Sequence, residues 1–341
     1  MEYKHAYIVT HADLDGVGAA AAFLRILGVR PGRGATVVYS EPYNIDETLG
    51  ALEDYVEGGD LLAVTDLGLN EDVREKVVSI VERLVGKGVR VEWYDHHVWS
   101  EDDLNSLKKA GALVFVDKST CATGVVVRYA SSVRGVKPDG FLVELESTVC
   151  SADLWRWDNS LSPKLFRAVG SREEAREWRD RVLAKFVEGI LWDEELEARL
   201  QQYVSEELKN MEKIMETVYV KEAGQLKIVA VYKTEGPPAN SIVGALLESR
   251  YGAHIAGIIR PNGGLSLRSK TVNVQAIAVK LGGGGHYRAA GARINMPVWV
   301  KTLSKIYPKI ASWYAAKTVA EAVKSMSPES LKIKAEESEY W

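Results

Sequence analysis

Acidic and histidine side chains follow several apolar segments of the sequence, in positions from which they could bind metal ions. The set comprises His11, Asp13, Asp15, Asp66, Asp95, His96, His97 and Asp153. The first three occupy alternate positions, so their side chains point the same way where the chain is extended. Four or more carboxylates gathered at one place repel one another unless cations neutralise them. The pattern therefore predicts a site for two divalent metal ions.

The mixture of carboxylates and imidazoles also indicates which metals and which chemistry to expect. Such ligands favour Mn²⁺, with Mg²⁺, Zn²⁺ or Co²⁺ as alternatives. Two ions about 3.5–4 Å apart can activate a water molecule and bind a phosphoryl group. Any single member of the set has a simpler interpretation, and Asp15 alone could merely cap the helix that follows it. The repetition at successive strand ends favours the metal site.

The first 120 residues are predicted to form a parallel sheet that positions these side chains. Strands are expected at 6–10, 35–39, 61–65, 89–93 and 112–116, with helical segments such as 71–86 between them. Strands that alternate with helices indicate βαβ units. Their almost entirely apolar composition fits a sheet covered on both faces. In an open sheet of this kind the carboxyl ends of the strands form the ligand crevice.

The rest of the chain is predicted to form a helical connector and a second, smaller α/β domain. The connector is charged, helical in period and almost free of Gly and Pro. In the second domain we expect strands at 226–233 and 254–259 and helices at 241–250 and 274–281. The expected bounds are 1–161 for the catalytic domain, 162–222 for the connector, 223–325 for the second domain and 326–341 for a tail.

Length and composition limit the partners and the location. With 341 residues and 46% hydrophobic side chains, the chain has the composition of a soluble protein of one or two domains. Its net charge of −4 argues against a protein that coats long duplex DNA by charge alone. No apolar segment has the length of a membrane span, and we expect no membrane partner. From only two cysteines, Cys121 and Cys150, we expect no disulfide framework and a cytoplasmic location.

Four short motifs and a glycine run resemble those of the DHH phosphoesterase superfamily, in the same order. The motifs are HADLDG at 11–16, TDLG at 65–68, DHH at 95–97 and SAD at 151–153. The segments SLRS at 266–269 and NVQAIAVKLGGGGHYRAAGA at 273–292 resemble the DHHA1 domain of one large branch. The likeness covers residues 5 to about 293 and implies a RecJ-like or oligoribonuclease-like protein, of archaeal type.

The resemblance implies a role for each residue of the motifs. Two metal positions would share one bridging aspartate: the ligands are His11 and Asp13 for one ion, Asp15, His96 and Asp153 for the other, and Asp66 for both. Asp95 would act from behind the ligands, where a carboxylate orients an imidazole. His97 would face the scissile phosphate or protonate the leaving group, and a packing role is its alternative.

The second domain is expected to bind the rest of the substrate. Backbone amides of a tight glycine loop can approach a phosphate closely, and neighbouring arginine and histidine side chains add donors. The implied contacts come from Arg268, Gly284, Gly285, His286 and Arg288. Two further sets of residues have two possible roles each.

Helix capping and a phosphate contact are the alternatives for Ser119, Thr120 and Thr123. Packing or base stacking is open for Trp93, Trp99, Trp155 and Trp157.

Together these observations predict a two-metal phosphodiesterase or exonuclease that hydrolyses short single-stranded RNA or DNA to mononucleotides, with a homodimer as one possible state. The charge balance favours short oligonucleotides over long ones. One alternative is hydrolysis of small nucleotides such as cyclic di-AMP, linear dinucleotides or 3′-phosphoadenosine 5′-phosphate. A pyrophosphatase of the same superfamily is a second alternative, although that branch carries a different second domain. A third is an inactive scaffold of a replication complex, which would have lost metal ligands.

Overall fold

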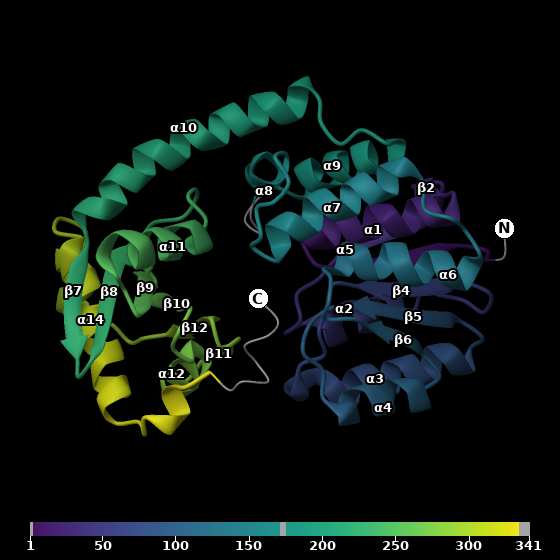
Figure 1. The fold of residues 1–341 in the computed structure, drawn as a ribbon. Coiled ribbons are helices and arrows are strands. Elements are labelled where there is room, and N and C mark those ends of the chain that lie inside the picture. Colours follow the sequence, from purple (N-terminus) through teal and green to yellow (C-terminus); the bar gives the residue numbers. More distant parts are fainter. Residues whose placement is uncertain (1–2, 171–174, 334–341) are drawn as a thin grey trace. The chain divides into compact units, whose positions relative to one another are not determined.

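The computed structural model describes residues 3–170 and 175–333 and divides into two compact units (Figure 1). The division falls between Gln201 and Gln202, inside helix α10 (Glu194–Glu216). The bounds of the two domains, the connector and the tail expected from the sequence stay a prediction, and residues 334–341 of the expected tail lie outside the described residues. No helix in the described ranges is both long enough and apolar enough to cross a membrane.

A six-stranded parallel sheet lies at the centre of the N-terminal unit, which confirms the predicted α/β class. In spatial order its strands are β2 (Arg30–Pro31), β3 (Gly34–Tyr39), β1 (Ala6–Thr10), β4 (Leu61–Thr65), β5 (Arg90–Asp95) and β6 (Leu113–Val116). The register aligns Thr10 with Tyr39 and Thr65, and aligns Thr65 with Tyr94. The residues that follow these strands therefore emerge at one edge of the sheet.

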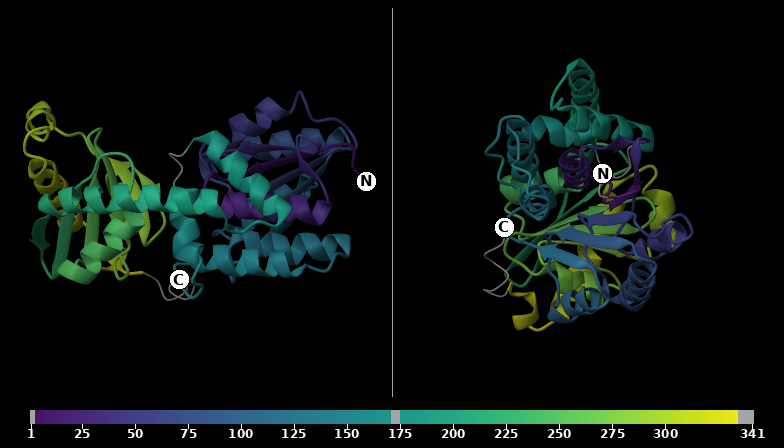
Figure 2. Two further views of the ribbon diagram at one scale, coloured as in Figure 1. Left: turned by 90° about the horizontal axis from the view of Figure 1, so that it is seen from above. Right: turned by 90° about the vertical axis from the view of Figure 1, so that its right-hand side faces the viewer.

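Helices cover both faces of this sheet (Figures 1 and 2). The alanine-rich helix α1, whose segment Ala19–Ala22 is fully buried, packs with its neighbours on one face. The helices of that face are α1 (Leu14–Leu27), α5 (Ala122–Val125), α7 (Gly140–Asp153), α8 (Ser162–Val169) and α9 (Arg176–Glu188), and α5 continues through the π-helix η1 (Val126–Ala130) into α6 (Ser131–Arg134). The other face carries α2 (Ile45–Leu52), α3 (Glu71–Gly86) and α4 (Glu101–Lys109).

In this arrangement the connections from two neighbouring strands diverge to opposite faces of the sheet. The chain leaves β1 towards α1 on one face and leaves β4 towards α3 on the other face. Where adjacent parallel strands lead to opposite faces, their carboxyl ends are left uncovered between the diverging connections, and ligands bind there in open α/β sheets. His11 and Asp66 are the first residues beyond these two strands.

The C-terminal unit is built on a second, mixed sheet, which confirms the expected smaller α/β domain. In spatial order its strands are β11 (Gly284–Gly285), β12 (Ala289–Arg293), β10 (Gly264–Arg268), β9 (Ile255–Ile259), β8 (Leu226–Tyr232) and β7 (Tyr219–Ala223). Only the β8–β9 pair is parallel among these described strands. Its helices are α11 (Asn240–Tyr251), α12 (Val274–Lys280), α13 (Val298–Leu303) and α14 (Lys309–Lys324), followed by the 3₁₀-helix η2 (Glu329–Leu331).

The glycine run is partly a strand, where the sequence suggested a tight loop. Gly284 pairs with Gly291, and Gly285 pairs with Ala290. A β-carbon at Gly283 or Gly285 would collide with the backbone of β12. Glycine is therefore required here by the close approach of two strands, whatever the run also binds.

The two cysteines form a disulfide, so the expectation that the chain contains no disulfide framework is wrong. Cys121 lies at the N-terminus of α5 and Cys150 lies on α7, and both side chains are buried. A sequence separation of 29 residues carries no information about the distance in space. The bond ties two helices that pack against each other on α1.

We expect replacement of both cysteines, as Cys121→Ala with Cys150→Ala, to lower the free energy of unfolding. The loss should be about 3–4 kcal/mol, because a cross-link over a loop of this length restricts the unfolded chain. Chemical denaturation without reductant measures it. Reductant should destabilise the wild type by a similar amount and leave the double variant unchanged. Equal stability of the two proteins without reductant would contradict the disulfide.

Candidate metal centre

The residues predicted to bind metal converge at the carboxyl ends of the strands. His11 follows β1, Asp66 follows β4, His96 follows β5, and Asp153 is the last residue of α7. Three groups each bring one ligand atom per residue within 4.8 Å of the others. The groups are His11, Asp13 and Asp66; Asp15, His96 and Asp153; and Asp66, His96 and His97.

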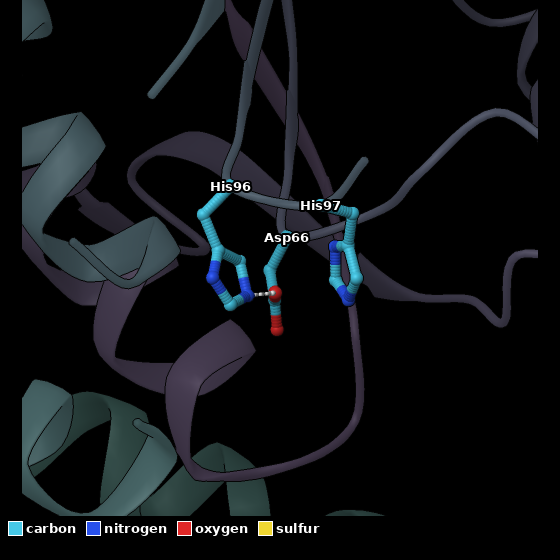
Figure 3. Close-up of side chains that lie close together, drawn as sticks. All are labelled: Asp66, His96 and His97. Carbon is cyan, nitrogen blue, oxygen red and sulfur yellow. Dashed lines mark ion pairs between the residues drawn. The ribbon is translucent and has the colours of Figure 1, made fainter. Parts of the chain in front are cut away.

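Asp66 lies between the groups and belongs to two of them. Its Oδ2 is 3.5 Å from His11 Nδ1, and its Oδ1 is 3.6 Å from His96 Nε2. Figure 3 shows the imidazoles of His96 and His97 on either side of the Asp66 carboxylate. The backbone of Asp66 is left-handed, with φ 57°, and its amide donates to the Tyr94 carbonyl at 3.0 Å. The hydrogen bond to β5 and the left-handed backbone together fix the position of the Asp66 carboxylate.

The turn between β1 and α1 positions Asp13. Its side chain caps α1 by accepting a hydrogen bond from the Gly16 amide at 3.1 Å, and its Oδ2 is 2.8 Å from His11 Nδ1. Asp13, rather than Asp15, is therefore the residue that caps this helix. A β-carbon at Gly16 would collide with the carbonyl of His11, so the tight turn requires glycine.

Asp15 is buried and held by the N-terminus of α5. It accepts hydrogen bonds from the amides of Ala122 and Thr123, at 2.7 and 2.9 Å, and from Thr123 Oγ1 at 2.7 Å. Thr123 therefore binds a carboxylate of another element and does not cap its own helix. Ser119 donates to Asp117 at 2.6 Å. Asp15 Oδ2 also lies 3.8 Å from His96 Nε2.

Crowding of buried carboxylates changes the affinity of the cluster for protons. Burial raises the pKa of Asp15 well above its usual value, and the charges of Asp66 and Asp153 add to the effect. Burial raises the pKa of Asp153 to about 6, with help from nearby carboxylates, although 25% of its side chain is exposed. Burial lowers the pKa of His96, but Asp153, Asp66 and Asp15 outweigh it and raise that pKa well above its usual value.

The donor set fits divalent cations. Asp66 Oδ2 and Asp153 Oδ2 are buried and have no hydrogen-bond partner among the described residues. Buried polar atoms normally have partners, so such atoms gathered in one place indicate an ion as the missing one. Carboxylate oxygens and imidazole nitrogens are ligands suited to Mn²⁺, Mg²⁺, Co²⁺ or Zn²⁺.

Asp95 binds His97 rather than either metal group. Its Oδ1 is 2.8 Å from His97 Nδ1, and its Oδ2 accepts a hydrogen bond from Trp99 Nε1 at 2.6 Å. Burial alone would raise the pKa of Asp95, but His97, His96 and Trp99 lower it to about 2. Trp93 and Trp99 are buried, so packing is their role. Asp95 is therefore a charged anchor that orients the His97 ring.

One carboxylate near the cluster was missed from the sequence. Glu41 Oε2 is 3.4 Å from His11 Nε2. Glu41 comes two residues after β3, so it emerges at the same sheet edge as the other acids. The sequence could have revealed Glu41, because it is an acid that follows a strand, as the other acids do. It differs from Asp66 in that Ser40 separates it from the strand.

The residues predicted to bind the substrate lie in the C-terminal unit, at one end of the β10–β12 pair. Arg268 pairs with Ala289, and the Ser269 amide donates to the Arg288 carbonyl at 3.0 Å. The Arg268 side chain packs against Gly244 of α11, where a β-carbon would collide with it. His286 N donates to Ala289 O at 2.8 Å in the turn between β11 and β12. Their contacts with substrate stay a prediction.

Comparison with known proteins gives matches at the level of a domain and of the fold. Residues 223–307 match the DHHA1 domain family. A search of curated protein sequences found no significant match. RecJ from Thermus thermophilus in complex with Mn²⁺ superposes with a TM-score of 0.55 at 17% identity. That alignment covers 92% of this chain and 52% of RecJ, so the chain spans about half the length of that protein.

Two further structures share the fold along their length. An exonuclease RecJ bound to manganese gives a TM-score of 0.53 at 18% identity, with 95% of this chain and 93% of that chain covered. CDC45 from Entamoeba histolytica gives a TM-score of 0.52 at 6% identity, and the alignment covers 94% of this chain and 96% of CDC45. The C-terminal unit therefore contains a match to the DHHA1 domain family, and the fold of the chain is similar to that of the two RecJ structures and of CDC45.

Proposed function

We propose that the chain is a two-metal phosphodiesterase that hydrolyses short single-stranded RNA or DNA to mononucleotides. The observation that carries the proposal is the position of Asp66, whose two oxygens face different histidines. Shared carboxylates of this kind hold pairs of ions in enzymes that act on phosphate esters. Two RecJ structures with this fold contain manganese, which supports Mn²⁺ as the metal.

The proposed ligands follow the two groups described above: His11, Asp13 and Asp66 for one ion, and Asp15, His96, Asp153 and Asp66 for the other. When bound, the ions would lower the pKa of a water molecule and neutralise phosphoryl oxygens. His97 would face the leaving oxygen and donate a proton, in an orientation set by Asp95. Glu41 would keep the His11 ring in place.

The proposal extends to the C-terminal unit and to the setting of the enzyme. Arg268, Arg288, His286 and the amides of Gly284 and Gly285 would bind phosphates of the strand, in a monomer or a homodimer. We also propose a cytoplasmic location. A buried disulfide fits that location in hyperthermophiles, whose intracellular proteins are rich in disulfides.

A substrate panel tests the proposal directly. Purified protein with Mn²⁺ is given RNA and DNA of two to 24 nucleotides, cyclic di-AMP, 3′-phosphoadenosine 5′-phosphate and pyrophosphate. We expect the shortest oligonucleotides to be degraded to mononucleotides with the highest kcat/KM. Hydrolysis of cyclic di-AMP or pyrophosphate alone would contradict the proposal in favour of another phosphoesterase. Full metal occupancy without any hydrolysis would indicate a scaffold.

We expect Asp66→Asn to abolish activity and Mn²⁺-dependent stabilisation while the metal-free protein stays folded. Asparagine keeps the shape of the side chain and tolerates a left-handed backbone, but it lacks the charge that both ions would share. In EDTA the melting temperature should equal or exceed that of the wild type, since one repelling charge is gone. Melting with and without Mn²⁺, metal analysis and dinucleotide hydrolysis measure these effects.

Asp60→Asn is the matched control for this variant. Asp60 is buried just before β4, at the opposite end of the same strand, and accepts a hydrogen bond from the Glu57 amide at 2.9 Å. The control should keep both ions and the wild-type rate. An Asp66→Asn protein with two ions and a near-normal rate would refute the bridging role.

We expect Asp95→Asn to reduce kcat by about 10–100-fold, the range typical of a residue that orients a catalytic or ligating histidine. The metal content should not change, because Asp95 bonds to His97 and Trp99. Trp99→Phe removes one hydrogen bond to the same carboxylate and should have a smaller effect. Loss of metal in Asp95→Asn would show that this residue is itself a ligand.

We expect Arg268→Ala to raise KM for dinucleotides and to blunt the preference for short strands, without loss of metal. The reason is that it removes a phosphate anchor but leaves the reacting groups unchanged. Arg293→Ala is the control, because Arg293 is exposed on β12 at the far end of the same strand pair. An unchanged KM in Arg268→Ala, or a wild type that prefers long strands, would contradict this role.

A further inference from the structure

The segment that follows Asp153 contains two tryptophans in an unusual backbone conformation. Trp155 and Trp157 have φ of 56° and 57°, and Asp66 is the third described non-glycine residue with a positive φ. A β-carbon disfavours this left-handed conformation, and glycine or asparagine is the usual occupant. Strained backbone of this kind tends to occur at functional sites. The two bulky side chains therefore require an explanation.

The backbone of the segment does not need the indoles. The amides of Arg156 and Trp157 both donate to the Ser151 carbonyl, at 2.9 and 3.1 Å. The Asn159 amide donates to Ser151 Oγ at 3.1 Å. These bonds wrap the segment over the end of α7, and glycine at either tryptophan position would allow the same path.

Packing explains one of the two tryptophans. Trp157 packs against the buried core of the N-terminal unit, together with Phe166. Trp155 is half-buried and is not among the described side chains packed on that core. Its ring meets Trp157 at 4.7 Å and 72°, and Phe166 at 6.2 Å and 83°. Both neighbours meet the Trp155 indole at steep angles, and neither stacks in parallel on it. These contacts therefore support the ring but leave it without a stacked partner.

Trp155 also follows closely in sequence on the more exposed member of one ligand group. Asp153, two residues earlier, has 25% of its side chain exposed, against 1% for Asp15 in the same ligand group. Arg156 follows directly, with 46% of its side chain exposed. Arg156 forms an ion pair with the exposed Asp158 at 3.5 Å. Exposed ion pairs of this kind contribute little to stability, so Arg156 can give up this partner for a phosphate. One short segment thus presents a flat ring and a cation next to a proposed metal ligand.

We propose that Trp155 is a stacking platform for the nucleobase next to the scissile phosphate, with Arg156 binding a neighbouring phosphate. This inference rests on the proposed hydrolysis of oligonucleotides and identifies where the base is held. An indole braced by edge contacts is a suitable surface, because every base has a flat π-face. Recognition by stacking and charge is independent of base identity, which suits an enzyme that degrades mixed sequences.

The test compares Trp155→Gly and Trp155→Phe with the wild type. Glycine suits the left-handed backbone, so it removes the ring without loss of the turn. The substrates are the dinucleotide pApA and two analogues, each with one base replaced by hydrogen. In the wild type, loss of the stacked base should raise KM about 5- to 150-fold. Trp155→Gly should raise KM for pApA by a similar factor, so that pApA and the analogue without the stacked base have the same KM. Trp155→Phe should keep most of the difference in KM between these two substrates.

Two controls separate stacking from a structural role. The melting temperature and its shift with Mn²⁺ should be the same in Trp155→Gly and the wild type. Trp299→Ala, at an exposed tryptophan of α13, should leave KM unchanged. A Trp155→Gly protein with the wild-type KM and the wild-type response to base loss would overturn the proposal.

A binding measurement distinguishes failure of this inference from failure of the proposed function. Titration of metal-free protein with AMP, followed by tryptophan fluorescence, should show quenching that Trp155→Gly weakens at least about fivefold in affinity. Quenching that depends on Trp155, in an enzyme that cleaves no oligonucleotide, would support the base site and contradict the function. Equal AMP affinity in both proteins, in an enzyme that cleaves oligonucleotides, would contradict the base site alone.

Discussion

Mutual repulsion of buried carboxylates is the constraint on which the N-terminal unit depends. Asp15 and Asp66 are almost completely buried, and Asp153 lies beside them at the end of α7. Without compensation, such a cluster opposes the folding of the strands and helices that carry it. Burial and like charges raise the pKa values of Asp15 and Asp153, and neighbouring carboxylates raise the pKa of His96, so the metal-free cluster favours protonation. Divalent cations bound by these residues would supply the same compensation at neutral pH, when protons are scarce.

The fold contributes to the compensation through backbone amides. Asp13 caps α1, and Asp15 accepts hydrogen bonds from the first amides of α5. Helix N-termini carry partial positive charge, so both carboxylates are stabilised by elements that the chain needs for packing. The disulfide joins the residue before α5 to α7, the helix that ends in Asp153. The supports of the proposed second ion position are therefore tied together covalently.

The sequence predicts the parallel sheet and the gathering of acids because both depend on local patterns. Most strands of the N-terminal sheet are largely apolar runs, and parallel register brings whatever follows them to one edge. Features that depend on contacts between segments far apart in the sequence leave no such local pattern. The Cys121–Cys150 bond and the approach of Gly285 to β12 arise only when helices and strands pack. The left-handed backbone of Asp66 likewise accompanies a hydrogen bond to a residue of another strand, Tyr94.

The short distance between strand ends and candidate ligands also bears on how such a protein can diversify. His11 and Asp66 directly follow β1 and β4, and His96 directly follows β5. Insertions or deletions further along each connection leave these positions unmoved, because the sheet register holds them. The sequences of these connections can therefore vary while His11, Asp66 and His96 keep their places at the sheet edge. Such a sheet edge can in principle present the same candidate ligands to different substrates, because loop residues beyond the strand ends are free to change.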